Sequence, residues 1–331
     1  MLNLLKRLAL GMAVLFVLVI GSIWVLKLRA DARVFDGYEP YAPLDVFIRS
    51  DEPMEDYRRI EFVYRGRVDT DDSLIRDVPT IMCTPLGDGP WPTLIFLHGI
   101  GQKKDFVEEI AGPFVAAGFA ILCSDQYMQG ERRLPSGTSA IDQGLALRRR
   151  AALNVLETRR MIDYLETRRD IAHDRIYLMG ASFGAITGSN AAAFDERIAA
   201  AVLCYGGGHT PSLVDSEAVR GEVGAWMGLV KVAASALFGP LDPVNHIHMI
   251  SPRPILVQGG NFDRVVPAAS TLALYEAAED PKELRMYDSD HVGLDAEHVV
   301  VVLNDTLEWL KAREREVVAA ESRGGDLQAA L

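Results

Sequence analysis

The chain has 331 residues, of which 49% are hydrophobic and 24% are charged, and its formal net charge is -12 at pH 7. This composition excludes a disordered chain, and the length suffices for one large α/β domain of roughly 250 residues with additional segments. An acidic chain without a cluster of lysines and arginines also argues against nucleic acid as a partner.

The N-terminal segment differs from the rest in composition, because Leu8–Leu26 carries no charge. About 20 apolar residues span a bilayer core, whereas the apolar cores of secretory signals are shorter. A cleaved signal is the alternative, since Ala30–Ala32 has the small-x-small form of a cleavage site, but Lys27 and Arg29 intervene. We therefore expect residues 1–30 to form an uncleaved, single-pass membrane anchor, with a cytoplasmic N-terminus and an exported domain.

After a connector over residues 31–53, short apolar or alternating runs predict β-strands along the chain. They lie at Arg59–Tyr64, Val78–Cys83, Thr93–Leu97, Phe119–Cys123, Arg175–Met179, Ile198–Tyr205, Pro254–Gly259 and Glu283–Tyr287. Stretches with helical spacing separate or follow them, at Phe106–Ala117, Ile141–Arg168, Ala268–Glu279 and Glu297–Arg315. Strands that alternate with helices predict an α/β fold with a mostly parallel, doubly wound sheet over residues 54–315.

Residues 206–250 interrupt this alternation. Within them, Val219–Phe238 is amphipathic to apolar and predicts a helical cap over the binding cleft. The alternative is a helix pair packed on the sheet, and in either arrangement the segment would line or flank the pocket. Residues 316–331 are rich in glycine, alanine and charged residues and predict a flexible tail.

Two residue types in these elements are open to a functional interpretation. The cysteines Cys83, Cys123 and Cys204 each lie in or beside a strand-like run, which favours buried free thiols over a disulfide framework or a metal site. The arginines of Ile141–Arg168, among them Arg148–Arg150, suggest an anion site. Interspersed glutamates favour a solvated helix face instead.

The segment Gly180–Gly184 has the pattern G-x-S-x-G and directly follows the strand-like run Arg175–Met179. Small residues suited to a helix packed closely on a sheet come after it. On such a strand-to-helix turn a serine hydroxyl is exposed, and the helix N–H groups point at negative charge that forms beside it. The pattern predicts that Ser182 is the nucleophile of an acyl-transfer site, provided that a base and an acid lie nearby.

A serine hydroxyl needs an adjacent base to act as a nucleophile. Among the seven histidines, His291 lies in the loop after the predicted strand Glu283–Tyr287. This loop is at the carboxyl edge of the sheet, where α/β sheets bind their ligands. His98 is the competing candidate, but its place directly before Gly99 favours a role in shaping the loop.

The acid that orients the histidine is expected in the glycine-bracketed loop that contains Asp263. Asp288 and Asp290 are the alternatives, although Asp290 adjoins His291 in the sequence, so that their side chains would tend to diverge. The order Ser182, Asp263, His291 is one in which serine triads occur on α/β sheets.

The negatively charged oxygen of a tetrahedral intermediate needs N–H donors held in place beforehand. We expect them to be the backbone N–H groups of Phe183 and Ile100, with Gly99 or Gly101 as alternatives to Ile100. The pair His246-Ile247-His248 is too little for a metal site, because no cysteine, aspartate or second histidine pair accompanies it. We expect neither a metal nor a cofactor.

Together these residues resemble the α/β-hydrolase superfamily, and within it the dienelactone-hydrolase-like, acetyl-xylan-esterase-like and prolyl-oligopeptidase-like serine hydrolases. The matching segments are Leu97–Gly99, Asp125–Arg132, Gly180–Gly184, Ser251–Pro254, Asn261–Pro267 and Asp290–His291. The resemblance implies an α/β-hydrolase fold, a catalytic triad and an acyl-enzyme mechanism that needs no cofactor.

Two departures from these families favour a carboxylesterase that acts on a small-molecule ester. Dienelactone hydrolases carry a cysteine at the nucleophile position, where this chain has Ser182. The peptidase relatives carry a large propeller domain before the hydrolase domain, where we expect only the anchor and a short connector in this chain. A peptidase or a thioesterase with the same triad is the alternative. A catalytically silent, membrane-tethered binding module is disfavoured by the intact triad. The segment Asp125–Arg132 resembles a loop that borders the cleft in such esterases, and we expect its charges to pair with one another.

Overall fold

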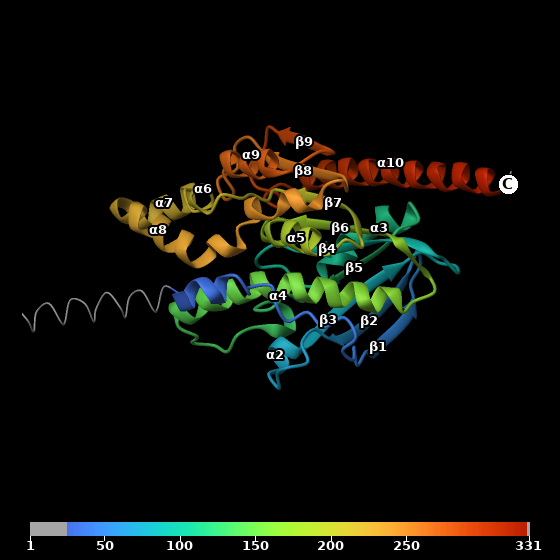
Figure 1. The fold of residues 1–331 in the computed structure, drawn as a ribbon, viewed down its shortest axis with the longest axis horizontal. Helices are drawn as coiled ribbons and strands as arrows, with labels where there is room; N and C mark the ends of the chain where they lie inside the picture. Colours follow the sequence, from blue (N-terminus) through green and yellow to red (C-terminus); the bar gives the residue numbers. More distant parts are fainter. Residues whose placement is uncertain (1–24, 330–331) are drawn as a thin grey trace, which may run out of the picture. The chain divides into compact units, whose positions relative to one another are not determined.

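The computed structural model, shown in Figure 1, describes residues 25–329, apart from the side chains of residues 218 and 320–329. It divides into two units, Met1–Gly37 and Tyr38–Leu331. All the described strands belong to the second unit, as does every residue expected at the candidate site.

The described part of the first unit contains a helix over residues 25–31. The membrane-spanning helix expected at Leu8–Leu26 lies outside the described residues, apart from its last two. The membrane anchor therefore stays a prediction.

The second unit is built around one sheet, which has nine strands within the described residues. They are β1 (Phe47–Pro53), β2 (Arg58–Arg65), β3 (Asp77–Thr84), β4 (Trp91–Leu97), β5 (Ala120–Ser124), β6 (Ile171–Ala181), β7 (Ile198–Cys204), β8 (Ile255–Gly260) and β9 (Lys282–Tyr287). Their spatial order is β1-β2-β3-β5-β4-β6-β7-β8-β9. The pairs from β5 to β9 are parallel and those from β1 to β5 are antiparallel, which confirms the expected mostly parallel sheet.

The edge strand β1 lies in the segment that we expected to be a connector. Its sequence, FIRSDEP, has one half-buried residue among exposed ones, so neither face shows an apolar pattern. It is a strand because its backbone pairs antiparallel with β2, from Phe47 opposite Val63 to Pro53 opposite Arg58. Such pairing leaves no signal in hydrophobic periodicity.

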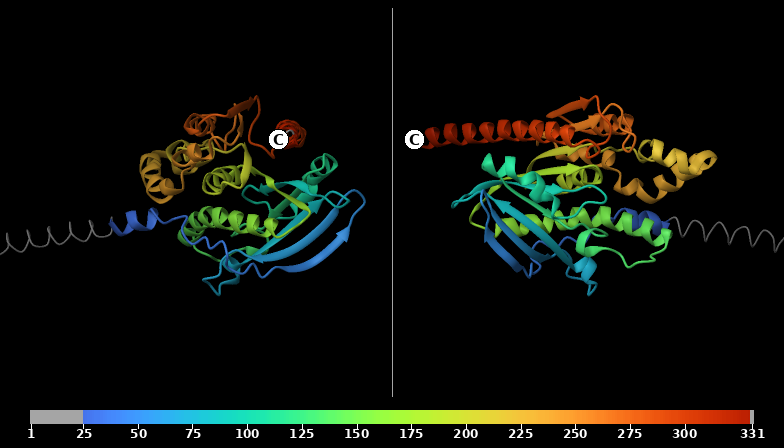
Figure 2. Two further views of the ribbon diagram at one scale, coloured as in Figure 1. Left: turned by 45° about the vertical axis from the view of Figure 1, so that its right-hand side comes forward. Right: turned by 180° about the vertical axis from the view of Figure 1, so that it is seen from behind.

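Helices cover both faces of the sheet, as Figure 2 shows. On one face, α3 (Phe106–Ala116) and α10 (Ala296–Ala329) bury Phe114 and Leu310 in a cluster with Phe96 of β4. On the other face lie α4 (Ala140–Glu166), α5 (Phe183–Phe194) and α9 (Ala268–Ala277). All three cysteines are free and buried between these layers, as expected.

The C-terminal helix α10 is longer than the stretch Glu297–Arg315 that spacing predicted. It continues to Ala329, through the segment for which we expected a flexible tail. Alanine, glutamate and arginine are strong helix formers, and they outweigh Gly324 and Gly325 in this segment. Among the described side chains, the last ones of α10 that are buried in the core are Trp309 and Leu310.

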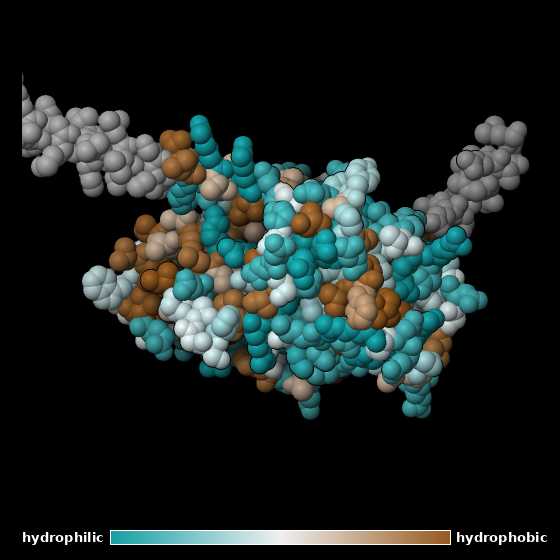
Figure 3. Space-filling model, turned by 90° about the horizontal axis from the view of Figure 1, so that it is seen from below, coloured by the Kyte–Doolittle hydropathy of each residue, from teal (hydrophilic) through white to brown (hydrophobic). Residues whose placement is uncertain are grey.

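Between β7 and β8 the chain is helical, as predicted for residues 206–250. It forms α6 (Thr210–Leu213), α7 (Glu217–Val223) and α8 (Met227–Phe238), with short 3₁₀ turns before β8. Trp226, Leu229 and Val232 are exposed, and Figure 3 shows hydrophobic surface gathered at this end of the domain. Within residues 25–329, Val219–Leu241 is the single helical stretch long and apolar enough to cross a membrane by length and composition.

Candidate active site

Ser182 lies between β6 and α5, on the sharp turn that the sequence predicts. Its backbone has φ 54° and ψ -119°, a conformation that is sterically unfavourable for a residue with a side chain. The neighbouring glycines make the turn possible, because a Cβ on Gly184 would overlap the carbonyl oxygen of Leu97, and one on Gly180 would overlap that of Gly184. The N–H of Ser182 donates to the carbonyl oxygen of Cys204 at 2.8 Å, which ties the turn to the end of β7.

His291 lies between Ser182 and Asp263, so the structure brings the three predicted residues together. Its Nε2 is 2.8 Å from Ser182 Oγ, and its Nδ1 is 2.7 Å from Asp263 Oδ2. The other carboxylate oxygen of Asp263 accepts the N–H groups of Val265 and Val266, each at 2.8 Å. Because a carboxylate only accepts, the proton of His291 lies on Nδ1 and the lone pair of Nε2 faces the serine hydroxyl.

The alternative acids have other partners. Asp290 pairs with Arg264, whose Nε donates to Oδ2 at 2.6 Å, and this hydrogen bond lowers the pKa of Asp290 to about 2. Asp288 accepts from the side-chain amide of Asn261 at 2.6 Å. Of the three candidate carboxylates, Asp263 is therefore the one that contacts the His291 ring.

The loop after β4 leaves Ile100 as the free donor among the three expected candidates. The N–H of Gly99 donates to Gln102 Oε1 at 3.0 Å, and that of Gly101 donates to Gln129 Oε1 at 3.1 Å. The N–H of Ile100 has no hydrogen-bond partner among the described residues. A free amide in this loop is the arrangement that an oxyanion hole requires.

Phe183 supplies the second expected donor as the first residue of α5. A residue at this position has no carbonyl of its own helix to accept its N–H. The donor is next to the nucleophile in the chain and points along the positive end of the helix dipole. Ile100 and Phe183 thus each have a main-chain donor available for an oxyanion.

His98 is buried beside this loop and does not contact Ser182. Its Nδ1 donates to the carbonyl oxygen of Gly99 at 2.7 Å, and burial lowers its pKa to about 4. The side-chain amide of Gln126 donates to the carbonyl oxygen of His98 at 2.8 Å. These contacts agree with the role in shaping the loop that the sequence favoured for His98.

Arg150 is fully buried, so the prediction of a solvated helix face is wrong for this residue. Its Nε and Nη2 donate to Gln126 Oε1 at 3.0 and 2.6 Å, and its guanidinium lies 4.6 Å from the centre of the Phe183 ring. The described residues place no carboxylate on it, and burial lowers its pKa to about 9. The stripe that Arg150 shares with buried Ala146 and Leu153 on α4 was the available signal.

The charges of Asp125–Arg132 pair partly with one another and partly with residues outside the segment. Asp125 accepts the N–H groups of Glu131 and Lys104, and Lys104 Nζ is 2.7 Å from Glu131. Arg132 binds Glu157 of α4 through two buried hydrogen bonds of 2.6 and 2.8 Å. The segment is fixed by these pairs, which leaves its charges unavailable to a ligand.

Tyr205, at the end of β7, is a residue of the site that the sequence analysis missed. Its hydroxyl is 2.6 Å from Ser289 Oγ and also hydrogen-bonds to His298 Nε2. Its ring meets that of His291 edge-on, with centres 6.0 Å apart. Tyr205 therefore supports the loop that carries His291, and nothing in the sequence distinguishes it from an ordinary core tyrosine.

A cavity of about 550 Å³ opens beside Ser182 and His291. Its walls come from the loops after β4, β8 and β9, from α3, from the strands β4, β6 and β7, and from the start of α10. No residue of the predicted cap, 206–250, is among those that line it. The cavity lies on the sheet face covered by α3 and α10, so the segment does not line this cavity, and the cap over the cleft stays a prediction.

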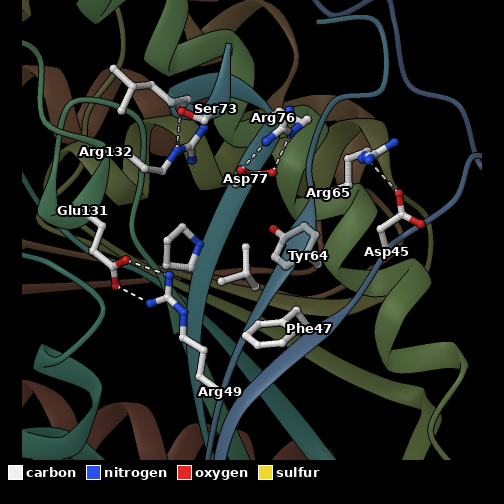
Figure 4. A pocket seen from close by; sticks show the side chains of 13 residues that line it. Asp45, Phe47, Arg49, Tyr64, Arg65, Ser73, Arg76, Asp77, Glu131 and Arg132 are labelled. Atoms are coloured by element: carbon white, nitrogen blue, oxygen red, sulfur yellow. Dashed lines mark hydrogen bonds and ion pairs between the residues drawn. The ribbon is translucent and has the colours of Figure 1, made fainter. Parts of the chain in front are cut away.

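A second hollow, of about 470 Å³, lies over β1–β3 (Figure 4), and Ser182 is not among the residues that line it. Arginines line it, but each is paired with an acid: Arg49 with Glu131, Arg65 with Asp45, Arg76 with Asp77, and Arg132 with Glu157. Because these cations are neutralised, the hollow offers no free charge to an anion.

The described residues contain no group of three or more histidines, cysteines, aspartates or glutamates that could hold a metal ion. In the pair His246-Ile247-His248, His246 Nε2 lies 3.2 Å from the carbonyl oxygen of Pro240.

The sheet order, the strand-to-helix turn at Ser182 and the residues around it define an α/β hydrolase. Residues 78–293 match the model of the dienelactone hydrolase family, and the chain belongs to this family. It is accordingly a carboxylic ester hydrolase. The resemblance to this family noted in the sequence is confirmed.

Several similar proteins are esterases by name. Esterase YjfP of Escherichia coli (strain K12) is 26% identical over 216 residues, which cover 62% of this chain and 83% of the relative. Acetyl xylan esterase 1 from Thermoanaerobacterium sp. JW/SL YS485 superposes with a TM-score of 0.66 at 18% identity, over 85% of this chain and 93% of that one. The acetyl xylan esterase from Paenibacillus sp. R4 gives 0.64 at 20% identity, over 87% and 93%. At such identities the two structures indicate a shared fold.

Proposed function

We propose that the chain is a serine carboxylesterase in which Ser182 attacks the ester carbonyl while His291 takes the hydroxyl proton. The Oγ–carbon bond forms, and the N–H groups of Ile100 and Phe183 bind the resulting oxyanion. Collapse of this intermediate breaks the bond to the alcohol oxygen, which receives the proton from His291. Water then repeats the sequence on the acyl-enzyme and releases the acid, with Asp263 holding the His291 ring throughout.

The observation that supports this proposal is the pair of hydrogen bonds on His291, 2.8 Å to Ser182 and 2.7 Å to Asp263. The two bonds give the histidine the tautomer in which Nε2 accepts a proton from the serine. Both lie within the range required of a nucleophile, its base and the group that orients the base.

Labelling by a fluorophosphonate probe tests the proposal. The full chain is expected to react covalently, and Ser182→Ala is expected to lose the label together with at least about a thousandfold of esterase activity. Ser189→Ala is the matched control, because this serine is buried in α5 and its hydroxyl has no hydrogen-bond partner among the described residues. A folded wild-type chain that does not react would contradict the proposal and favour a binding module.

A substrate panel separates the ester reading from its alternatives. We expect p-nitrophenyl esters to be cleaved, and aminoacyl amides and acyl-CoA thioesters to be poor substrates. A higher kcat/KM for an amide or a thioester than for any ester would replace the esterase proposal with a peptidase or a thioesterase.

The apolar segment Leu8–Leu26 supports a further part of the proposal, namely that the enzyme is held at a membrane by a single N-terminal helix, with its hydrolase domain exported. The full chain should stay in the membrane fraction after alkaline carbonate extraction, and removal of residues 1–30 should release it. Reporter fusions at the C-terminus test the orientation. Extraction of the full chain by carbonate would contradict the anchor.

A further inference from the structure

The cavity beside Ser182 has walls that are mainly apolar. Phe96 and Met179 form its floor on the sheet, Phe106 and Ile110 line it from α3, and Val302 lines it from α10. Among all its lining residues there is no lysine, arginine, aspartate or glutamate. A charged group that entered it would lose its hydration without gaining a partner, which is unfavourable by several kcal/mol.

Most polar side-chain atoms in the walls have partners or belong to the catalytic machinery, and the amide nitrogen of Gln102 is the exception among the described residues. Gln102 Oε1 accepts the N–H of Gly99, and the thiol of Cys204 donates to Gln258 at 2.9 Å. Ser182 and His291 bind each other. A ligand with several hydroxyls, such as a sugar, would find few groups here to replace its hydrogen bonds to water.

The size of the cavity argues against a very small acyl group. A water molecule occupies about 30 Å³ of the liquid, so a volume of 550 Å³ has room for more than ten groups of that size. An acetyl group places a single methyl beyond its carbonyl carbon and would leave most of this volume unfilled. Empty apolar volume forfeits dispersion contacts, whereas a longer chain gains them.

The position of the cavity indicates which part of the ester enters it. Ile100, whose free N–H is a proposed oxyanion donor, lies in the cavity wall. The remainder of the wall is formed in part by residues of α3 and α10 and includes no residue of the segment 206–250. A chain attached to the carbonyl carbon can follow this wall, while the alcohol leaves on the side open to solvent.

We propose that this cavity is the acyl pocket and that the enzyme prefers esters of uncharged aliphatic acids with roughly six to ten carbons over acetate esters. The inference rests on the proposed function, because it assumes that Ser182 forms the acyl-enzyme. The reaction releases a medium-chain fatty acid and an alcohol, with the proton of Ser182 transferred to the alcohol through His291.

Two ester series test the proposal on the full chain in lipid nanodiscs. In the first, p-nitrophenyl esters from acetate to dodecanoate keep the leaving group constant. In the second, acetates of alcohols with increasing chain length keep the acyl group constant. We expect kcat/KM to rise up to fourfold for each added acyl methylene, since burial of one contributes about 0.8 kcal/mol, and to reach at least about tenfold over acetate near octanoate. The alcohol series should be nearly flat.

A pair of adjacent valines on α10 supplies a blocking variant with a matched control. Val299 lines the cavity, whereas Val300, the next residue, does not line it and is 56% exposed. Val299→Trp should lower kcat/KM for octanoate at least about tenfold and leave the value for acetate within about threefold. Val300→Trp should change neither. If Val299→Trp does not fold, Leu303→Phe, one turn further along the same wall, replaces it.

The outcomes separate the pocket from the chemistry. A maximum at acetate in the wild-type series, or a chain-length profile that Val299→Trp leaves unchanged, overturns the acyl pocket while the esterase stands. A dependence on the alcohol chain instead of the acyl chain reassigns the cavity to the leaving group and also overturns the proposal. Absence of hydrolysis of every ester, with no fluorophosphonate labelling, means that the proposed function itself has failed.

Discussion

The two faces of the sheet differ in the side chains that lie next to the candidate site. On the α4 and α5 face, Arg150, Gln126 and Asn154 form a buried polar cluster joined by hydrogen bonds of 2.6 to 3.0 Å. On the α3 and α10 face, the walls of the cavity are apolar and carry no charge. The polar cluster is closed and holds a cation, while the apolar side is open and has room for a ligand.

The difference suggests that the two faces of the sheet affect different steps, one the transition state and the other the binding of substrate. A buried cation behind Gly99 and Phe183 favours negative charge at the nearby amides, so the polar face acts on the transition state. The apolar face contacts the substrate chain in the ground state and the transition state alike. Changes on the polar face should therefore alter kcat and stability, whereas changes on the apolar face should alter substrate preference.

The largest expected effect comes from removing the acceptor that holds the cation. Gln126→Leu would leave buried Arg150 with only its 3.4 Å hydrogen bond to the carbonyl oxygen of Gly99, and loss of a partner of a buried charge costs about 3–5 kcal/mol. Urea unfolding of the purified chain measures this change. Gln129→Leu is the control, because Gln129 accepts one hydrogen bond at an exposed loop, and an equal loss of stability in both variants would refute the special role of the cluster.

The next effect is a pH dependence of stability that originates at His98. Burial lowers its pKa to about 4 in the folded chain, against 6.5 for an unperturbed histidine. The unfolded chain therefore binds more protons between these values, so the stability present above pH 6.5 is lost as the pH falls toward 4, by up to about 3 kcal/mol. His98→Gln should flatten the curve of unfolding free energy against pH in this window. An unchanged slope would show that another group titrates.

A smaller effect is expected on catalysis when the cation itself is removed. Arg150→Met should lower kcat about tenfold and leave KM and the acyl-chain preference unchanged, because the charge acts on the oxyanion through neighbouring groups and not by direct contact. Arg150→Lys, which keeps the charge, should recover part of the loss. A change of KM with a constant kcat would mean that Arg150 supports binding and not the transition state.

The smallest effect is expected on the apolar face. Ile110 already borders an empty volume, so Ile110→Ala should destabilise the chain by only about 1–2 kcal/mol, below the 2–5 kcal/mol usual for such changes in packed cores. The preferred acyl chain should lengthen by one or two carbons. Val115→Ala on the same helix, buried but outside the cavity, is the control for stability; thermal unfolding and the ester series measure both effects.

The sequence was sufficient for the central strands and for the three residues that meet at His291. The central strands are continuous apolar runs, and Ser182 and Asp263 each follow one of them. His291 follows β9, a mixed polar and apolar strand at the end of the same parallel sheet. When several loops share one edge, their side chains come together without any further information about packing.

Other features depend on contacts that a single sequence does not display. The strand β1 lacks an apolar face, and Arg150 is of a type that is almost always solvated. The cavity needs α3 and α10, which are far apart in the chain, to leave a gap between them. Likewise, the helical character of residues 206–250 does not determine which side of the sheet holds the pocket.

The left-handed backbone of Ser182 bears on how an inactive form of the enzyme should be made. Its φ of 54° is accessible to glycine at little cost and to other residues at on the order of 1–3 kcal/mol. Ser182→Ala keeps this backbone strain, whereas Ser182→Gly removes it. The glycine variant should therefore have the larger free energy of unfolding. The conformation that activity requires at position 182 therefore lowers the free energy of unfolding. An inactive variant for substrate trapping should carry glycine at this position.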